Sequence, residues 1–335
     1  MNVFYILLSG IINNKIRLDK YLINIIKIYT RNKIQKLIKN GFIQINQKKI
    51  NKNYYIKSYD LIFFLKKKII KKYNYNNNYY YNNNIFPEKI YLNIIYEDTD
   101  IIVVNKQPGL IVHPCDTIKK GTLINALEYY FNKKNFKNKI FYNIVHRIDK
   151  DTSGLIIISK NKKSFISLKK QFFLRKIKKK YLAIVWGDLK NNSGIIENYI
   201  IRDSNNRKRM MVSSNNKGKY SLTYYYVIKR FYYFSLINCF IKTGRKHQIR
   251  VHMKHIGHPI FNDNLYGGNK ILKGNINSYF YKKIILNCFK ILNRQALHAQ
   301  SIEFFHPYKK KYICFNTHIP NDIKNFLKIL NKIKF

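Results

Sequence analysis

Apolar residues recur at helical spacing near the start of the chain. Leu18, Leu22 and Ile25 share one face of a helix that begins near Arg17. Thr30 is placed to cap a second helix, and Gly41 is placed to end it in a left-handed conformation. The buried face of this helix would hold Ile34, Leu37 and Ile38. Residues 42–46 alternate as a strand and residues 61–65 form another, so the pattern predicts a small α+β domain.

The pattern changes after this first segment. Residues 66–84 are rich in lysine, asparagine and tyrosine without an apolar period, which predicts a low-complexity linker that extends to residue 90. Short apolar runs at residues 156–158, 182–185 and 236–241 then predict strands. Two longer stretches predict helices, one at residues 123–131 with Thr122 as its cap and one at residues 164–173. A larger domain of strands and helices is therefore expected after the linker.

The charge of the chain indicates a polyanionic partner. The 335 residues include 64 Lys and Arg against 16 Asp and Glu, a net charge of +48, and 46% are hydrophobic, which is enough for a folded core. A positive charge of this size is typical of proteins that bind nucleic acid. The heavy use of Lys, Asn and Ile with only four alanines also indicates an AT-biased genome, which accounts for part of the lysine content.

Membrane, disulfide and metal functions receive no support. The apolar residues 3–12 are too few to cross a bilayer, which needs about 20, and no basic segment precedes them as in a signal peptide. The cysteines form no Cys-x-x-Cys pair, which favours reduced thiols in a cytoplasm. His247, His252, His255 and His258 lack the accompanying carboxylates or cysteines of a metal site, so we predict no metal.

The loop of residues 146–155 is the strongest candidate for chemistry. It reads HRIDKDTSGL and is flanked by apolar runs, so it places two carboxylates, an arginine and a Ser-Gly turn between strands. Loops held on a rigid sheet commonly carry catalytic groups. On the loop alone, Asp149 has two interpretations: a catalytic carboxylate, or a structural residue that pairs with Arg147.

Seven motifs spaced along the chain resemble one family. They are EDTDIIVVNKQPGL at residues 97–110, VHP at 112–114, GTLINAL at 121–127, HRIDKDTSGL at 146–155, KKYLA at 179–183, TGRKHQIRVH at 243–252 and RQALHA at 294–299. Together they resemble the ribosomal-RNA pseudouridine synthases that carry a His-Arg-Leu-Asp motif, with Ile148 in place of the usual Leu. The resemblance covers residues 16–325. It implies an α+β fold for residues 91–325, with a mixed, mainly antiparallel central sheet and flanking helices.

The resemblance also implies roles for five residues. Asp149 matches the essential aspartate, Arg250 the arginine that pairs with it, and Tyr181 the tyrosine that packs beside the uracil. Arg147 matches the residue that fills the stack when the target nucleotide leaves the RNA, and Arg245 would either bind phosphate or support the residues of the site. The isomerisation adds no outside group and changes no redox state, so no cofactor is expected. Taken singly, Tyr181 could be an ordinary strand aromatic and Arg250 a surface contact.

The first domain, taken as residues 16–65, resembles the alpha-L RNA-binding module. Its second helix would present Arg31, Lys33 and Lys36 to RNA, although a solvated basic face is the alternative interpretation. Two positions depart from the module, because Gln47 and Tyr59 stand where glycine is usual.

These features predict an RNA pseudouridine synthase. The expected partner is RNA, most simply large-subunit ribosomal RNA, and the expected state is a cytoplasmic monomer without a membrane association. Two alternatives stay open at this point. One is a factor that retains the fold and binds RNA or assists ribosome assembly without activity, and the other is a synthase that acts on transfer RNA.

Overall fold

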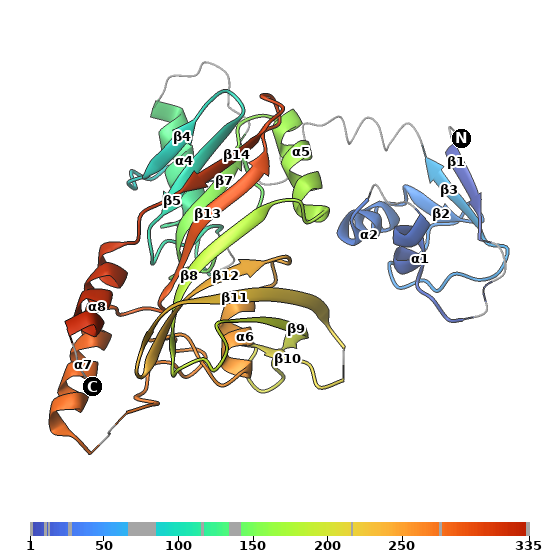
Figure 1. Ribbon diagram of the computed structural model, residues 1–335. Coiled ribbons are helices and arrows are strands. Elements are labelled where there is room, and N and C mark those ends of the chain that lie inside the picture. Colours follow the sequence, from blue (N-terminus) through green and yellow to red (C-terminus); the bar gives the residue numbers. More distant parts are fainter. Residues whose placement is uncertain are drawn as a thin grey trace. The chain divides into compact units, whose positions relative to one another are not determined.

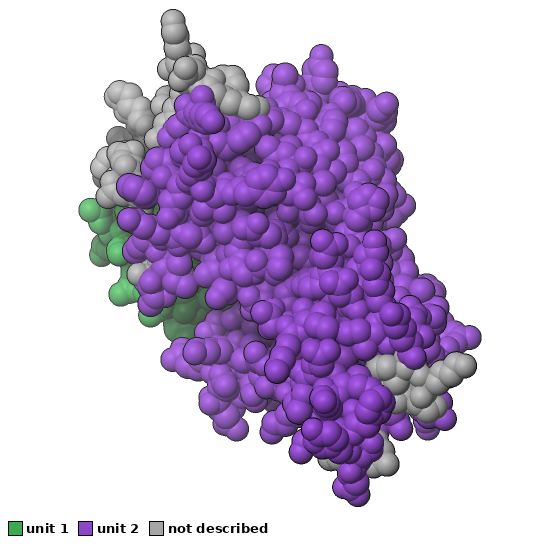
Figure 2. Space-filling view, turned by 90° about the vertical axis from the view of Figure 1, so that its left-hand side faces the viewer, with its two compact units in different colours: residues 1–83 green, residues 84–335 purple. Residues whose placement is uncertain are grey.

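The computed structural model describes residues 3–9, 12, 14–25, 29–65, 85–114, 117–133, 142–215, 217–274 and 277–332. The chain divides into two compact units, residues 1–83 and residues 84–335, which Figure 2 shows in separate colours. The linker predicted at residues 66–84 lies outside the described residues, as does Cys115. None of the helices in the described ranges has the length and apolar character of a membrane span.

The first unit is a three-stranded antiparallel sheet with two helices (Figure 1). Its elements are β1 (Val3–Leu8), α1 (Leu18–Ile25), α2 (Arg31–Lys39), β2 (Ile43–Ile45) and β3 (Leu61–Leu65), and the strand order is β1-β3-β2. The predicted helices and strands are confirmed. The apolar residues predicted for the helices are buried in the core of this unit with one exception. Ile25, the last residue of α1, is 44% exposed, so its predicted place on the buried face is wrong. Strand β1, which pairs with β3, was not predicted from the sequence.

The ends of α2 test the capping predictions. Gly41 has a φ of +68°, and its N–H donates to the carbonyl of Ile38 at 2.9 Å. The next N–H, of Phe42, donates to Leu37 at 2.8 Å, which completes a Schellman motif. Thr30 occupies the predicted N-cap position with an extended backbone, although its side chain makes no capping hydrogen bond.

Two residues of the first unit adopt the left-handed conformation that the RNA-binding module usually gives to glycine. Gln47 has a φ of 65° and Tyr59 a φ of 63°. The turns of the module are therefore retained even though the residues that favour them are absent, at a cost of about 1–2 kcal/mol for each side chain in this conformation.

The second unit is built on an 11-stranded sheet in which antiparallel pairs predominate. The main path runs β10-β9-β11-β12-β8-β13-β7-β5-β4, while β14 pairs with β13 and β6 with β7. The strands are β4 (Ile94–Glu97), β5 (Ile101–Lys106), β6 (Asn143–Ile144), β7 (Ser153–Ser159), β8 (Lys178–Trp186), β9 (Ser193–Arg202), β10 (Met210–Val212), β11 (Lys219–Phe231), β12 (Phe234–Ile241), β13 (Leu297–Phe305) and β14 (Tyr312–Asn316). The three predicted strands lie inside β7, β8 and β12, and the mixed, mainly antiparallel sheet is confirmed.

Helices flank this sheet (Figure 1). They are α4 (Leu123–Lys133), α5 (Lys162–Phe173), α6 (Gln248–His255), α7 (Tyr279–Ile291) and α8 (Asn321–Lys332). Thr122 caps α4, because its hydroxyl accepts the N–H of Asn125 at 3.4 Å. The helix predicted at residues 164–173 begins two residues earlier, because the side chain of Asn161 caps it by accepting the N–H of Ser164 at 2.9 Å.

Gly154 allows β7 to lie close to β13 beside the candidate site. Strand β13 pairs in parallel with β7, where Ala299 lies opposite Gly154, and antiparallel with β8, where Ala299 lies opposite Tyr181. Gly154 has a φ of +113°, and a Cβ atom there would lie 2.2 Å from the carbonyl oxygen of Ala299. Glycine is therefore required for the pairing that brings the loop before β7 and the face of β8 to the same region of the sheet.

Candidate active site

The second unit contains a cavity of about 590 Å³ that gathers the predicted residues of this unit. Its lining includes Asp149, Tyr181, Arg250, Arg147 and Arg245. These residues come from segments distant in the sequence, namely the loop before β7, strand β8 and the segment at the start of α6. Asp149 is the only acidic residue among the described residues that line the cavity, while lysines and arginines are frequent there. The cavity therefore suits an anionic ligand, and the carboxylate of Asp149 would face that ligand.

The loop that carries Asp149 is held in place by two buried basic side chains. Nζ of Lys106, whose pKa is lowered to about 7 by burial, donates to the carbonyl of Lys150 at 2.8 Å, and the guanidinium of Arg294 donates to the carbonyl of Asp151 at 3.1 Å. Arg294 is itself held by Asp322 at 2.7 Å, on helix α8. The loop is thereby attached both to β5, near the start of the unit, and to α8, near its end. These attachments make the loop rigid, as a catalytic group requires.

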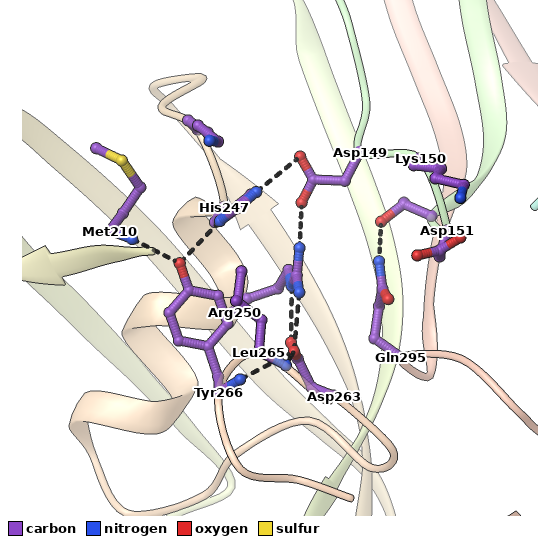
Figure 3. A network of polar contacts seen from close by, with 12 residues as sticks. Asp149, Lys150, Asp151, Met210, His247, Arg250, Asp263, Leu265, Tyr266 and Gln295 are labelled. Atoms are coloured by element: carbon purple, nitrogen blue, oxygen red, sulfur yellow. Dashed lines mark hydrogen bonds and ion pairs between the residues drawn. The ribbon is translucent and has the colours of Figure 1, made fainter. Parts of the chain in front are cut away.

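Asp149 is one end of a chain of charges shown in Figure 3. Its Oδ2 accepts a hydrogen bond from Nη1 of Arg250 at 3.0 Å. The other nitrogens of that guanidinium, Nε and Nη2, donate to the two carboxylate oxygens of Asp263 at 2.7 and 2.8 Å. Asp263 is completely buried, and its Oδ1 also accepts the backbone N–H of Leu265. The predicted alternative that Asp149 pairs with Arg147 is wrong, because its ion pair is with Arg250 and Arg147 is exposed.

The two carboxylates determine the charge state of Arg250. Burial by itself lowers the pKa of an arginine, but the hydrogen bonds and charge of Asp263, together with the charge of Asp149, raise the pKa of Arg250 above its ordinary value. Arg250 is thus a permanent cation. Its Nε and Nη2 bind Asp263, and its Nη1 binds Asp149.

Tyr181 lies in the same cavity with only 8% of its surface exposed. Burial and the negative charge of Asp149 raise the pKa of its hydroxyl. The side chain is therefore a neutral phenol at neutral pH. It offers a flat apolar ring and a hydroxyl to a ligand in the cavity, and it is not present as a phenolate base.

Arg245 is held apart from Asp149. Its Nε donates to the carbonyl of Tyr220 on β11 at 2.8 Å, and its backbone N–H donates to the side chain of Gln248 at 3.0 Å. Burial and the neighbouring Arg175 lower the pKa of its guanidinium. Arg245 and Arg250 lie in one sequence motif, yet they face different partners.

Two lysines add to the positive wall of the cavity. Burial lowers the pKa of Lys179, on β8, to about 8 and also lowers the pKa of Lys169, on α5. Lys179 lies over the ring of Phe172, with 5.7 Å between its ammonium and the ring centroid. Desolvated cations of this kind gain from an anionic ligand, since its charge offsets the cost of their burial.

Three histidines in or near the cavity hydrogen-bond groups of the fold. Nε2 of His146 accepts the backbone N–H of Ile157 at 2.9 Å, and burial lowers its pKa to about 3, so the first residue of the HRID sequence is a neutral structural group. His252 hydrogen-bonds Ser221, and His258 hydrogen-bonds the carbonyl of Trp186. Within the described residues, no three His, Cys, Asp or Glu side chains are grouped so as to hold a metal ion.

The predicted RNA-binding residues of the first unit have different environments. Arg31 forms an ion pair at 2.9 Å with Asp19, which is completely buried, so much of its charge is engaged within the unit. Lys33 lies 5.1 Å from the ring centroid of Tyr29, and Lys36 is exposed. The basic face of α2 therefore includes one arginine whose charge also stabilises the unit.

Comparisons with known proteins agree with this architecture. A model of the RNA pseudouridylate synthase family matches residues 100–255, and an S4 domain model matches residues 16–62. An uncharacterized RNA pseudouridine synthase of Chlorobaculum parvum is 37% identical over 332 residues, which cover 96% of this chain and 95% of the relative. A ribosomal large subunit pseudouridine synthase D of Neisseria meningitidis is 34% identical and covers 94% of this chain and 78% of the relative. A human protein, RNA pseudouridylate synthase domain containing 4, shares the fold with a TM-score of 0.55 and 22% identity, covering 71% of this chain and 92% of its own.

Fold, site and relatives define an enzyme of the isomerase class that modifies RNA. The chain belongs to the RNA pseudouridylate synthase family and carries an S4 domain at its N-terminus. Both were predicted from the sequence. Lys106 and Arg294 lie in the first and last of the seven motifs but were given no role, and Asp263 lies in none of them. Their contacts near Asp149 are seen only in the structure.

Proposed function

We propose that this protein converts particular uridines of large-subunit ribosomal RNA to pseudouridine, with Asp149 as the essential carboxylate. The observation that carries the proposal is the ion pair at 3.0 Å between Asp149 and Arg250, in a cavity whose described lining holds no other acid. The ribosomal target is supported by relatives named for the large ribosomal subunit.

The reaction needs a carboxylate in a defined orientation. The C1′–N1 bond breaks, the uracil turns, and C1′ joins C5, while the proton lost from C5 is balanced by one gained at N1. Asp149 acts on this nucleotide by attack on the sugar, attack on the base, or removal of a sugar proton. In each case Arg250 holds the carboxylate and fixes its rotation, which lowers the entropic part of the barrier.

The other residues of the cavity bind and expose the nucleotide. Tyr181, as a neutral phenol, packs against the uracil beside Asp149. Arg147 is exposed at the cavity and fills the stack that the target nucleotide leaves, since the glycosidic bond is out of reach inside a helix. Arg245 contacts phosphate, as do Arg31, Lys33 and Lys36 of the first unit.

The two domains have separate functions in this proposal. We assign RNA capture to residues 16–65 and catalysis to residues 91–325, joined by residues 66–90. We propose that the protein acts on this RNA in the cytoplasm and as a monomer. Light scattering of the free protein tests the monomer, and pseudouridine mapping of total RNA from cells with and without the gene separates ribosomal from transfer RNA targets.

The decisive experiment is Asp149→Asn. This change is nearly isosteric, so we expect loss of pseudouridine formation while RNA affinity stays within a few-fold. Pseudouridine is mapped by carbodiimide-stopped reverse transcription, and affinity is measured on the same transcript. If the wild-type protein binds ribosomal RNA but forms no pseudouridine, the alternative of an inactive RNA-binding or assembly factor is correct. Turnover by the asparagine variant would remove Asp149 from the mechanism.

A further inference from the structure

His247 stands beside Asp149 in a backbone conformation that few side chains adopt. It immediately precedes α6 and has φ 56° and ψ 23°, in the left-handed region. Non-glycine residues held in this region tend to cluster at functional sites, where the surrounding structure maintains them. The conformation directs the imidazole into the network of Figure 3, with 10% of its side chain exposed.

The two ring nitrogens of His247 face different partners. Nδ1 lies 2.8 Å from the hydroxyl of Tyr266, and Nε2 lies 3.9 Å from Oδ1 of Asp149. Arg250 binds the other carboxylate oxygen of Asp149, Oδ2. His247 and Arg250 therefore approach the same carboxylate on its two different oxygens.

The hydroxyl of Tyr266 determines which nitrogen of His247 carries the proton. That oxygen already accepts the backbone N–H of Met210 at 2.9 Å. Among the described residues, Nδ1 of His247 is the one acceptor within hydrogen-bonding distance of the hydroxyl proton, and burial raises the pKa of Tyr266 to about 12, so the proton is present. With Nδ1 as acceptor, the proton of a neutral imidazole resides on Nε2 and faces Asp149.

The charges around His247 keep the ring neutral. Burial lowers its pKa to about 4, and although Asp149 and Asp263 favour the cation, Arg250 and Lys246 oppose it. A neutral donor can fix the rotation of a carboxylate without the loss of basicity that a second cation would cause.

We propose that His247 is a positioning residue for Asp149: Tyr266 holds the imidazole in its Nε2–H tautomer, and this N–H engages Oδ1 when RNA occupies the cavity. The present separation of 3.9 Å is longer than a hydrogen bond, and such contacts commonly tighten when substrate binds. The inference rests on the proposed role of Asp149 and adds a second group that orients it.

The test compares two replacements that each retain part of the imidazole. His247→Gln keeps an N–H donor near the position of Nε2, whereas His247→Asn keeps a polar group only near the position of Nδ1. We expect His247→Ala and His247→Asn to lower the single-turnover rate at saturating RNA by roughly tenfold to a hundredfold, as for a misplaced catalytic group. His247→Gln should recover part of that loss, and RNA affinity should stay unchanged in all three.

Tyr266→Phe supplies an independent measurement. Tyr266→Phe should lower the single-turnover rate by itself. It should cause no further loss in the His247→Ala background, because both changes remove the same hydrogen bond between Tyr266 and His247. His255→Ala, at the exposed end of α6, is the matched control and should retain the full rate. Thermal unfolding of each variant shows whether the fold is intact, and if His247→Ala does not fold, the ratio of the Gln and Asn rates decides.

Any of three results would overturn the inference. The first is a full rate in His247→Ala. The second is a weaker affinity of that variant with a full rate at saturating RNA, which would make His247 an RNA contact. The third is equal impairment of the Gln and Asn variants. Asp149→Asn is assayed in parallel: an active Asp149→Asn variant refutes the proposed function itself, whereas an inactive one beside a fully active His247→Ala refutes only the role of His247.

Discussion

Replacing Arg250 by lysine keeps a positive charge in the site but removes the planar group that joins two carboxylates. The guanidinium makes three short contacts, two with Asp263 at 2.7 and 2.8 Å and one with Asp149 at 3.0 Å. A single ammonium cannot reproduce this geometry. Asp263 is completely buried, whereas 19% of the Asp149 side chain is exposed, so we expect the lysine to stay with Asp263 and release Asp149.

The expected loss of rate follows from the one hydrogen bond that is released. A hydrogen bond to a charged group contributes about 1.5–3 kcal/mol, which corresponds to a rate reduced by roughly tenfold to 150-fold. Arg250→Met should do more, because it leaves Asp263 buried without its counter-charge and should cost about 3–5 kcal/mol of unfolding free energy. The lysine variant therefore tests catalysis, and the methionine variant tests stability.

The assay is the single-turnover rate of pseudouridine formation at saturating RNA, with urea unfolding followed by circular dichroism. Arg245→Met is the comparison, because Arg245 lies in the same motif but donates to the carbonyl of Tyr220. It should weaken RNA binding, and saturating RNA should restore most of its rate. A wild-type rate for Arg250→Lys, or an equal loss in the two methionine variants, would refute the assignment of Arg250 as the partner of Asp149.

Three further predictions concern binding, pH and packing. Removing the charges of Lys33 and Lys36 should reduce the log–log salt slope of RNA affinity by about one unit for each phosphate that the protein no longer neutralises; an unchanged slope means that α2 does not touch RNA. The pKa of Lys179 falls to about 8 on folding from 10.5, so the unfolded state binds more protons between these values and stability should rise with pH across them; Lys179→Met should flatten that rise in thermal unfolding. Gly154→Ala should prevent stable folding, because its Cβ would lie 2.2 Å from the carbonyl oxygen of Ala299; a variant with a normal melting temperature would contradict the pairing of β7 with β13.

Helices and turns of the first unit could be predicted from the sequence because their signals are local. The apolar spacing of α2 and the glycine that ends it act within one or two turns of helix, and Gly41 makes the expected Schellman contacts. Arg31 shows the limit of such reasoning. Its place on the helix indicated a cation directed at RNA, but its partner Asp19 belongs to α1, and only the packing of the two helices reveals the ion pair.

Strands of the second unit were visible as short apolar runs, but their order was not. β7, β8 and β12 were each expected, whereas the position of β13 between β7 and β8 depends on contacts between residues more than 100 positions apart. Hydrophobic periodicity indicates which face of a strand is buried and carries no information on its neighbour.

Asp149, Tyr181 and Arg250 could be selected from the sequence because each lies in a recognisable motif, and the fold brings all three to one cavity. The sequence by itself thus determined the family, the two kinds of domain and the candidate carboxylate. Only the tertiary structure decided that Arg250 joins Asp149 to a buried second carboxylate, Asp263, and that His247 hydrogen-bonds Tyr266 beside the same site. The physical reason is that burial, pairing and tautomer depend on the distances between side chains, and those distances exist only once the sheet has brought distant segments together.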